Sequence, residues 1–352
     1  GSQTGREITG ALARMVADQE KITVFEETSA TALWSDGSRC HGVITDQGLI
    51  AAKATLLASG GAAALWRRTS NPWGAIGAGS VLAHAAGAEL ADLEFCQFHP
   101  TCVSAPGTSW DGALITEAIR GEGAVLLDVD GDRFTDELAP RDDVTSAILA
   151  QIERQGGRPV RLDLRRIEVD HFPSAFKMLE MAGYDATREP IPISPGAHYM
   201  MGGIAVDLDG STSLPGLYAA GEAACTGIHG ANRLASNSLT ECFVFGQRAA
   251  EAGLAEAESP LPDLPEWRFD PPTAETRESV WKLAGPQRTA AELEGLLDDP
   301  YPLARAIAAS ALARTESRGG HRRTDFPEPD PGLDGVHQIY DRDGRIEPRS
   351  WT

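Results

Sequence analysis

The spacing of apolar residues predicts a chain that begins with a helix and continues as short strands. Ile8, Leu12 and Val16 recur at helical spacing, which predicts a helix over residues 4–19. Runs rich in apolar and β-branched residues then predict strands at 22–25, 30–34 and 42–45. The continuous apolar run 54–58 ends in Ser59-Gly60-Gly61. It predicts a strand buried on both faces, with a ligand near its carboxyl end.

The later part of the chain repeats this pattern after a long mixed stretch. A helix is predicted within 76–90 and is closed by Gly87, and residues 93 to about 200 are rich in Gly, Pro and charge. An apolar strand ending in small residues returns at 214–222, and a helix is predicted over 238–258. Prolines between 260 and 272 indicate a stiff linker, and 273–317 reads as helical. The pattern therefore predicts an α/β domain made of two separated segments.

Composition narrows the possible partners. The chain has 352 residues, 51 acidic against 31 basic, for a net charge of −20. This charge would repel nucleic acid and anionic membranes. No stretch approaches 18 consecutive apolar residues, and the start shows no secretory pattern, so we expect a cytoplasmic protein. The five cysteines show no metal-ligand spacing, and we expect small buried thiols with no metal site and no disulfide.

The segment 226–241 is the most informative stretch for chemistry. It mixes Gly, Asn, Ser, His229 and Arg233 directly before a predicted helix. Because a helix N-terminus presents free backbone N–H groups, such a segment can bind an anion. The same residues also fit an ordinary loop that caps a helix.

This segment, with Gly221-Glu222 ahead of it, closely resembles the flavin-binding signature of L-aspartate oxidases, within the succinate dehydrogenase/fumarate reductase flavoprotein family. Its run Ala235-Ser236-Asn237-Ser238-Leu239 resembles aspartate oxidases, whereas succinate dehydrogenases and fumarate reductases usually have a Gly-Ala-Asn-Ser-Leu form. Other matching motifs occur in the family's order over most of 1–330: Leu57–Gly61, Ala88–Phe95, Gln97–Thr101, Thr116–Gly123, Ala139–Asp142, His198–Gly203 and Glu316–His321.

The resemblance implies an α/β fold, α+β overall, with a Rossmann-like FAD-binding domain in two pieces. These pieces are 1–92 and 200–262, and an α+β capping domain at 93–199 is inserted between them. A C-terminal helical domain at 273–326 and a polar tail at 327–352 follow. The family's G-x-G-x-x-G element, which holds the FAD pyrophosphate, is absent, because no such motif follows an apolar strand.

The resemblance also implies a substrate site between the flavin domain and the cap. A four-carbon dicarboxylate needs both negative groups neutralised, and planar arginine forks do this bidentately. By resemblance the substrate-binding residues are His99, Thr116, Glu117, Arg141, His198 and Arg233. Arg141, His99 and Glu117 are the implied catalytic residues, with Arg141 in proton transfer and Glu117 as a relay. We expect the two histidines and two arginines to form a local positive pocket.

The implied cofactor is non-covalent FAD. By resemblance, Ser59, Gly60 and Gly61 contact its adenosine half, Glu222 contacts the ribityl or ribose hydroxyls, and Asn237, Ser238 and Leu239 contact the flavin. The implied reaction is oxidation of L-aspartate to iminoaspartate in NAD biosynthesis, with reoxidation by O2 or fumarate. Quinolinate synthase is then a pathway neighbour, and the oligomeric state stays open.

The missing G-x-G-x-x-G leads us to expect a truncated or FAD-free form that binds FAD weakly or not at all, exposes unpaired sheet edges and is inactive alone. Two alternatives stay open. One is a fumarate reductase or succinate dehydrogenase-like flavoprotein, and the other is a flavin-less homologue that binds a dicarboxylate.

Overall fold

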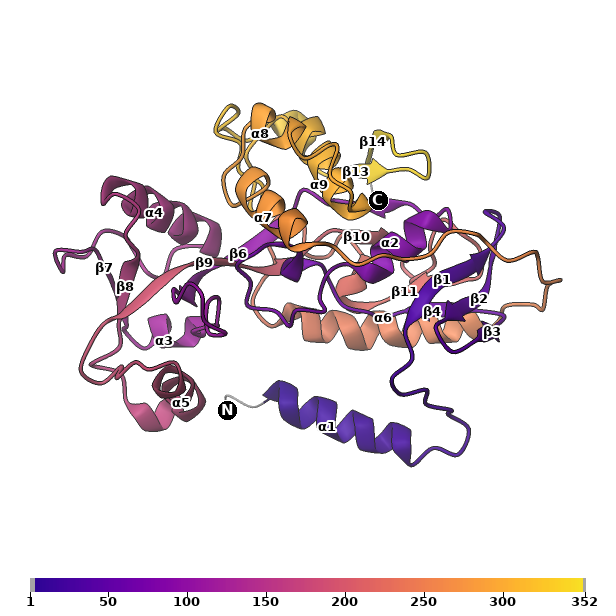
Figure 1. Cartoon of the computed structure of the whole chain (residues 1–352), viewed down its shortest axis with the longest axis horizontal. Coiled ribbons are helices and arrows are strands. Elements are labelled where there is room, and N and C mark those ends of the chain that lie inside the picture. The colour runs from indigo at the N-terminus through magenta and orange to yellow at the C-terminus, as the bar shows by residue number, and fades with distance from the viewer. Residues whose placement is uncertain (1–3, 351–352) are drawn as a thin grey trace.

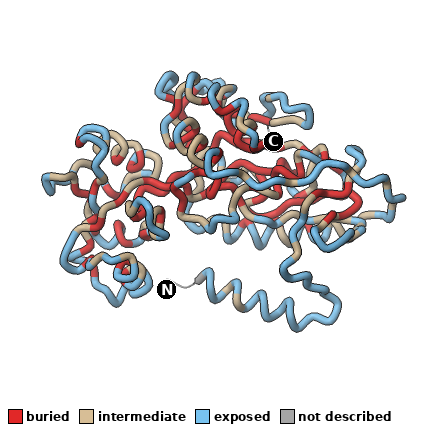
Figure 2. Tube along the Cα trace, viewed as in Figure 1, coloured by how far each residue is buried: buried red, intermediate tan, exposed pale blue. Residues whose placement is uncertain are grey.

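The structure is a computed structural model, and it describes residues 4–350. Figure 1 shows an elongated molecule in which a lobe built from the middle of the chain projects from a larger body. The segments before and after the lobe form the body, and the last helices cover one side of it. Figure 2 shows buried chain in both parts and along the strands that join them. Lobe and body are therefore connected through a packed junction.

The body contains three small sheets. The largest has the strand order β12-β10-β5-β13-β14, with β10 and β12 parallel and the other pairs antiparallel. Its strands are β5 (Leu90–Ala91), β10 (Gly203–Ala205), β12 (Ala224–Cys225), β13 (Val336–Tyr340) and β14 (Ile346–Ser350). An antiparallel sheet holds β1 (Ala30–Ser35), β2 (Cys40–Thr45) and β3 (Leu49–Ala51). A parallel pair joins β4 (Thr55–Leu57) to β11 (Leu217–Ala219).

The helices of the body come from both ends of the chain. They are α2 (Ala78–Ala85), α6 (Asn237–Leu254), α7 (Ala274–Leu283), α8 (Ala290–Glu294) and α9 (Pro302–Ala313). The first helix, α1 (Thr4–Ala17), is largely exposed and lies apart from the body in Figure 1. Short 3-10 turns lie at Ala63–Leu65, Gly221–Ala223 and Pro331–Leu333. One apolar core includes Leu33 of β1, Leu217 of β11 and Leu296 after α8. Segments that are far apart in sequence therefore fold into one body.

The lobe has its own sheet and its own core. Its strand order is β6-β9-β8-β7, formed by β6 (Cys96–Val103), β7 (Val125–Leu127), β8 (Val160–Asp163) and β9 (Ile191–Met200). Its helices are α3 (Glu117–Gly121), α4 (Arg141–Arg154) and α5 (Pro173–Met181), with a 3-10 turn at Val169–His171. Leu126, Ile148 and Leu179 are fully buried in its core. The long antiparallel pair of β6 and β9 links the lobe to the body (Figure 1).

Two strand predictions near the start are wrong. Residues 22–25 form no strand, and Ile22, Val24 and Phe25 are exposed. The predicted strand at 54–58 exists as β4, but Leu56 is 42% exposed instead of buried. The physical reason is the same in both places. An apolar run becomes a buried strand only where neighbouring strands and helices cover it, and β4 pairs with β11 alone.

The polar tail predicted at 327–352 contains two strands that the sequence did not indicate. Within it β13 pairs with β5, and Ile339 is buried in a small cluster with Ala91. Alternation around Ile339 is too short to stand out beside many charged neighbours, so tertiary pairing decides this strand. The predicted helices at 4–19, 76–90 and 238–258 are present but shorter, as α1, α2 and α6.

The thiols follow the expectation with one exception. Cys40, Cys96, Cys102 and Cys225 are buried, whereas Cys242 on α6 is exposed, and all five are free. Among residues 4–350, no helix is long and apolar enough to cross a bilayer.

Candidate active site

Two histidines face each other where the lobe joins the body. His99 lies on β6 and His198 on β9, and their ring centroids are 5.2 Å apart. The β6–β9 register pairs His99 with Gly196, which brings the two imidazoles to the same place on the sheet. Ser70 Oγ lies 2.7 Å from His198 Nδ1 and orients that ring. The fold therefore unites two residues that stand about a hundred positions apart.

Both histidines are neutral, which corrects the expected source of positive charge. Burial lowers the pKa of His99 well below its usual value, and the nearby His198 and arginines lower it further. Burial, followed by Arg141 and Arg233, lowers the pKa of His198 to about 3. The imidazoles are therefore hydrogen-bonding groups, and the arginines supply the positive charge.

Arg141 is the first residue of α4 and is held on two sides. Its Nε donates to Glu117 Oε2 at 2.8 Å, and its Nη2 lies 2.6 Å from the same oxygen. Its Nη1 donates to Gln97 Oε1 at 2.7 Å. Thr116 directly precedes α3, which begins at Glu117, so these two residues lie at the lobe side of the same site. The arrangement fixes the guanidinium before any substrate arrives.

Arg233 lies in the loop between β12 and α6 and is held differently. Its guanidinium carbon lies 4.4 Å from the centroid of the Tyr199 ring, and its Nη2 donates to Ser238 Oγ at 2.8 Å. Its Nε and Nη1 are buried without a hydrogen-bond partner among residues 4–350. A buried N–H donor without a hydrogen-bond partner is costly, so these two donors of Arg233 could bind an incoming carboxylate.

A buried polar cluster supports Tyr199 from behind. Glu241 Oε2 lies 2.7 Å from His229 Nε2 and accepts a hydrogen bond from the Tyr199 hydroxyl at 3.2 Å. The Thr226 hydroxyl donates to Glu241 Oε1 at 2.6 Å. Burial and the neighbouring carboxylates raise the pKa of Tyr199. This cluster keeps the aromatic ring in place under Arg233.

The predicted cofactor residues lie next to the arginine site, because Ser238 in the first turn of α6 accepts the hydrogen bond from Arg233 Nη2. A Cβ on Gly61 would lie only 2.3 Å from Glu222 Oε1, so these two segments touch, and Glu222 also accepts from the Met200 N–H at 3.0 Å. Burial raises the pKa of Glu222 to about 7. Gly60 has φ +77° and open space beside it. Asn237, Ser238 and Leu239 form the first turn of α6.

These residues fit FAD in two respects. Gly60 offers bare backbone in a left-handed conformation that other residues rarely adopt, which allows close approach of a ligand. The loop before α6 holds Gly230, which also has φ above zero and open space around it. Glu222 carries a largely buried carboxyl that can bond a hydroxyl.

Several residues of the site escaped prediction as site residues. Gln97 and Asn232 lie inside the recognised motifs, so their polar character was the available signal. Tyr199 and Glu241 also lie in or beside motifs, but their contact with Arg233 depends on tertiary packing. Arg322 gave no signal, because it stands in a basic turn near the end of the chain.

Comparisons with known proteins agree with this architecture. The family described as "FAD binding domain" matches residues 1–239, and "Fumarate reductase flavoprotein C-term" matches residues 274–345. The chain belongs to the succinate dehydrogenase/fumarate reductase flavoprotein family.

Within this family, the sequence is similar to L-aspartate oxidases. It is 43% identical to that of Caulobacter vibrioides, covering 98% of this chain and 72% of the relative, and 41% identical to that of Mycobacterium leprae, covering 93% and 70%. The fold is similar to FrdA of E. coli quinol fumarate reductase, with TM-score 0.84 and 26% identity over 99% of this chain and 75% of that one. Sdh1 of Mycobacterium smegmatis matches with TM-score 0.75 and 33% identity over 95% and 68%.

Proposed function

We propose that this chain forms the substrate site of an L-aspartate oxidase, which converts L-aspartate to iminoaspartate as the first step of de novo NAD biosynthesis. The chemistry that FAD supplies when bound is acceptance of two electrons, followed by return to the oxidised form with O2 or fumarate as acceptor. Similarity to L-aspartate oxidases over nearly the whole chain supports this assignment.

The observation that carries the proposal is the pairing of two unlike arginines at one site. Arg141 is fixed by Glu117 and Gln97, and Arg233 keeps two buried donors free. Both lie close enough to His198 to lower its pKa. A dicarboxylate placed there would put one carboxylate against each guanidinium, and the neutral imidazoles of His99 and His198 would add hydrogen bonds. Thr116, before α3, would bind substrate from the lobe side.

Arg141 and Glu117 are the proposed proton-transfer pair. The 2.8 Å contact joins Arg141 Nε to Glu117 Oε2, so a proton can pass between these two atoms. The side chain of Glu117 is 40% exposed, which gives the carboxylate access to water. A guanidinium holds its proton strongly, and a nearby carboxylate with solvent access offers the proton an exit.

We also propose that Ser59, Gly60, Gly61 and Glu222, with the first turn of α6, would hold FAD, and that this chain alone holds it weakly or not at all. The exposed Leu56 of β4, three residues before Ser59, supports weak binding, because the surface beside it is uncovered. An absorption spectrum of the purified protein should therefore lack stoichiometric flavin bands. A yellow protein with flavin near one per chain would contradict this.

Calorimetry tests the proposed substrate class. L-aspartate, succinate and fumarate should each bind, and L-aspartate should bind at least as tightly as succinate. Clear preference for succinate and fumarate would favour a fumarate reductase or succinate dehydrogenase-like protein instead. The second alternative, a flavin-less dicarboxylate-binding homologue, is favoured by the exposed Leu56 region. Absence of any dicarboxylate binding would refute the proposed function.

A further inference from the structure

A ring of hydrogen bonds connects the two arginines of the site. Gln97 Nε2 donates to Asn232 Oδ1 at 2.8 Å and to the Arg233 carbonyl at 2.8 Å, while Gln97 Oε1 accepts from Arg141. Asn232 Nδ2 donates to Asp142 Oδ1 at 2.9 Å, and Asp142 follows Arg141 in the chain. The ring thus ties together β6, the start of α4 and the loop that carries Arg233.

Arg322 lies outside this ring and contacts it at Asp142. Its Nη2 contacts Asp142 Oδ2 and lies 3.0 Å from Asp143 Oδ1, so one nitrogen bridges two carboxylates in the first turn of α4. Its Nε donates to the Gly319 carbonyl at 3.2 Å. Arg322 belongs to the C-terminal part of the chain, whereas both aspartates belong to the lobe. It is therefore an ionic link from the C-terminal part to the lobe at this site.

The loop that carries Arg322 also touches the Arg233 loop directly. The Gly320 N–H donates to the Ala231 carbonyl at 2.8 Å, and a Cβ on Gly319 would lie 2.2 Å from that same oxygen. Arg322, Asp142, Asn232 and Gln97 line a crevice of about 10 Å³. This volume is near the limit for a single water molecule and far too small for a dicarboxylate. Arg322 can therefore act on the substrate site only through its neighbours.

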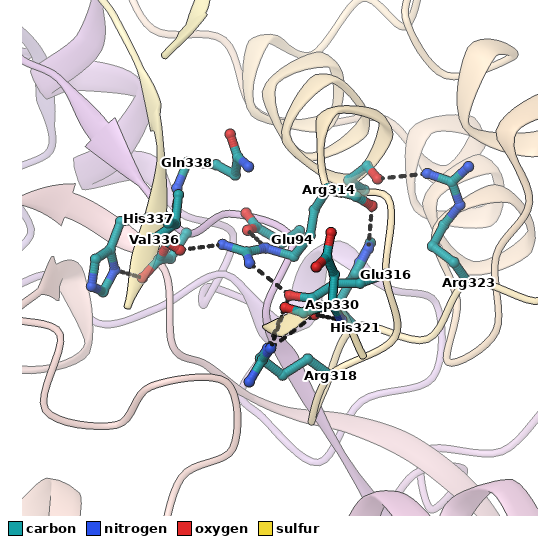
Figure 3. A network of polar contacts seen from close by, with 12 residues as sticks. Glu94, Arg314, Glu316, Arg318, His321, Arg323, Asp330, Val336, His337 and Gln338 are labelled. Atoms are coloured by element: carbon teal, nitrogen blue, oxygen red, sulfur yellow. Dashed lines mark hydrogen bonds and ion pairs between the residues drawn. The ribbon is translucent and has the colours of Figure 1, made fainter. Parts of the chain in front are cut away.

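The base of this loop is anchored by a buried ionic network (Figure 3). The Arg314 guanidinium lies between two buried carboxylates, 2.6 Å from Glu94 and 2.9 Å from Glu316, and it donates to the Val336 carbonyl. His321 Nε2 lies 3.1 Å from the Arg314 carbonyl oxygen, so the network reaches the residue next to Arg322. A loop fixed in this way presents Arg322 from a defined position.

We propose that Arg322 is a positioning residue of the dicarboxylate site. By holding Asp142, it keeps Arg141 and the Asn232–Arg233 loop in register, so that the two guanidinium groups stand ready for both carboxylates of one ligand. This role rests on the proposed function. A positioning effect of this kind acts on the preorganisation of the site, since loops and side chains that are already ordered cost less to bind.

The test compares four proteins: the unaltered chain, R322Q, R322K and the control R349Q. The control removes a comparable contact with two carboxylate oxygens. Arg349, on β14 and outside the ring, donates to both oxygens of Glu89 at 2.8 and 3.1 Å. Succinate is the calorimetric probe. R322Q should bind it about three- to tenfold more weakly, at unchanged midpoint of urea unfolding. R322K should recover most of the affinity, because a single nitrogen of Arg322 contacts both Asp142 and Asp143 and a lysine also offers one nitrogen. R349Q should leave the affinity for succinate unchanged.

Hydrogen exchange provides a readout that needs no ligand. R322Q should increase amide exchange at 142–144 and 231–234 while leaving β13 unchanged, and R349Q should not change the first two segments. If exchange at 142–144 and 231–234 does not change, the proposed role is wrong. The same holds if the unaltered chain binds succinate and R322Q binds it equally well. If the unaltered chain binds no dicarboxylate, the proposed function fails, while the exchange result still decides whether Arg322 orders the two segments.

Discussion

The substrate side and the cofactor side of this molecule are built in opposite ways. At the substrate side, Gln97, Asn232 and Asp142 satisfy one another, and their partners come from three parts of the chain. At the cofactor side, β4 exposes Leu56 and α6 exposes Phe243 and Val244. One side is a closed polar network, and the other is an uncovered apolar surface.

This difference indicates which ligand each side could bind with the residues of this chain alone. Arg141 and Arg233 are held by groups within the described residues, so the proposed recognition of a dicarboxylate would depend on the chain itself. In the proposed FAD site, the cofactor would contact Gly60 and the start of α6, and apolar side chains of α6 are exposed there among residues 4–350. Substrate affinity and cofactor affinity should therefore respond to different mutations, except at the Arg233–Ser238 hydrogen bond, where the two sites meet.

The largest expected effect separates two phenylalanines of α6. Phe245 is 5% exposed and packs into the body, whereas Phe243 is 55% exposed on the cofactor side. F245A should lower the free energy of unfolding by about 3–5 kcal/mol, because it opens a cavity in the core. F243A should change it by less than about 0.5 kcal/mol. Urea unfolding of both variants measures the contrast. A loss of more than about 2 kcal/mol in F243A would show that this face is covered.

The second prediction concerns the substrate side alone. R233Q should weaken succinate binding about 100-fold or more, because it removes a buried guanidinium whose Nε and Nη1 have no hydrogen-bond partner among the described residues and could bind a carboxylate. R248Q is the matched control, since Arg248 lies over the Phe245 ring farther along α6 and contacts no site residue in the described contacts. Calorimetry measures the succinate affinity of both variants. An equal loss of affinity in R248Q would show that the overall positive charge of the protein matters, and not a specific contact of Arg233.

How much of this could be read from the sequence differs between local and long-range features. The helical periodicity at Ile8, Leu12 and Val16 predicted α1, and the pattern over 238–258 predicted α6. Motif resemblance predicted which residues to examine, and the structure brings His99, His198, Arg141 and Arg233 to one junction.

What could not be predicted depends on tertiary neighbours. The apolar pattern at 54–58 looks the same whether or not strands cover it, so exposure of Leu56 was hidden. Pairing of Ile339 with Ala91 joins residues almost 250 positions apart, and no local pattern encodes it. Likewise the neutrality of His198 follows from burial beside two arginines, which the motif alone does not show. The fold class followed from pattern, and the electrostatics followed from packing.

The smallest predicted effect distinguishes the two sides by pH. The pKa of His198 is lowered from 6.5 to about 3, so the unfolded chain binds the extra proton first, and this residue should reduce stability as pH falls below 6.5. The pKa of Glu222 is raised from 4.5 to about 7, so its contribution has the opposite sign and stability is lost as pH rises from 4.5 to 7.

Two variants separate the contributions of His198 and Glu222 to the pH dependence of stability. H198Q should gain stability relative to the unaltered chain as pH falls from 6.5 toward 4, and E222Q should gain relative stability as pH rises from 4.5 to 7. Each difference should reach about 1 kcal/mol, which is below the roughly 3.4 kcal/mol that 1.36 kcal/mol per pKa unit gives over about 2.5 units, because local relaxation weakens both shifts. Urea unfolding at pH 4.5, 5.5, 6.5 and 7.5 measures both slopes. Parallel pH profiles for the two variants would show that the substrate and cofactor sides do not differ electrostatically, and the comparison would then rest on packing alone.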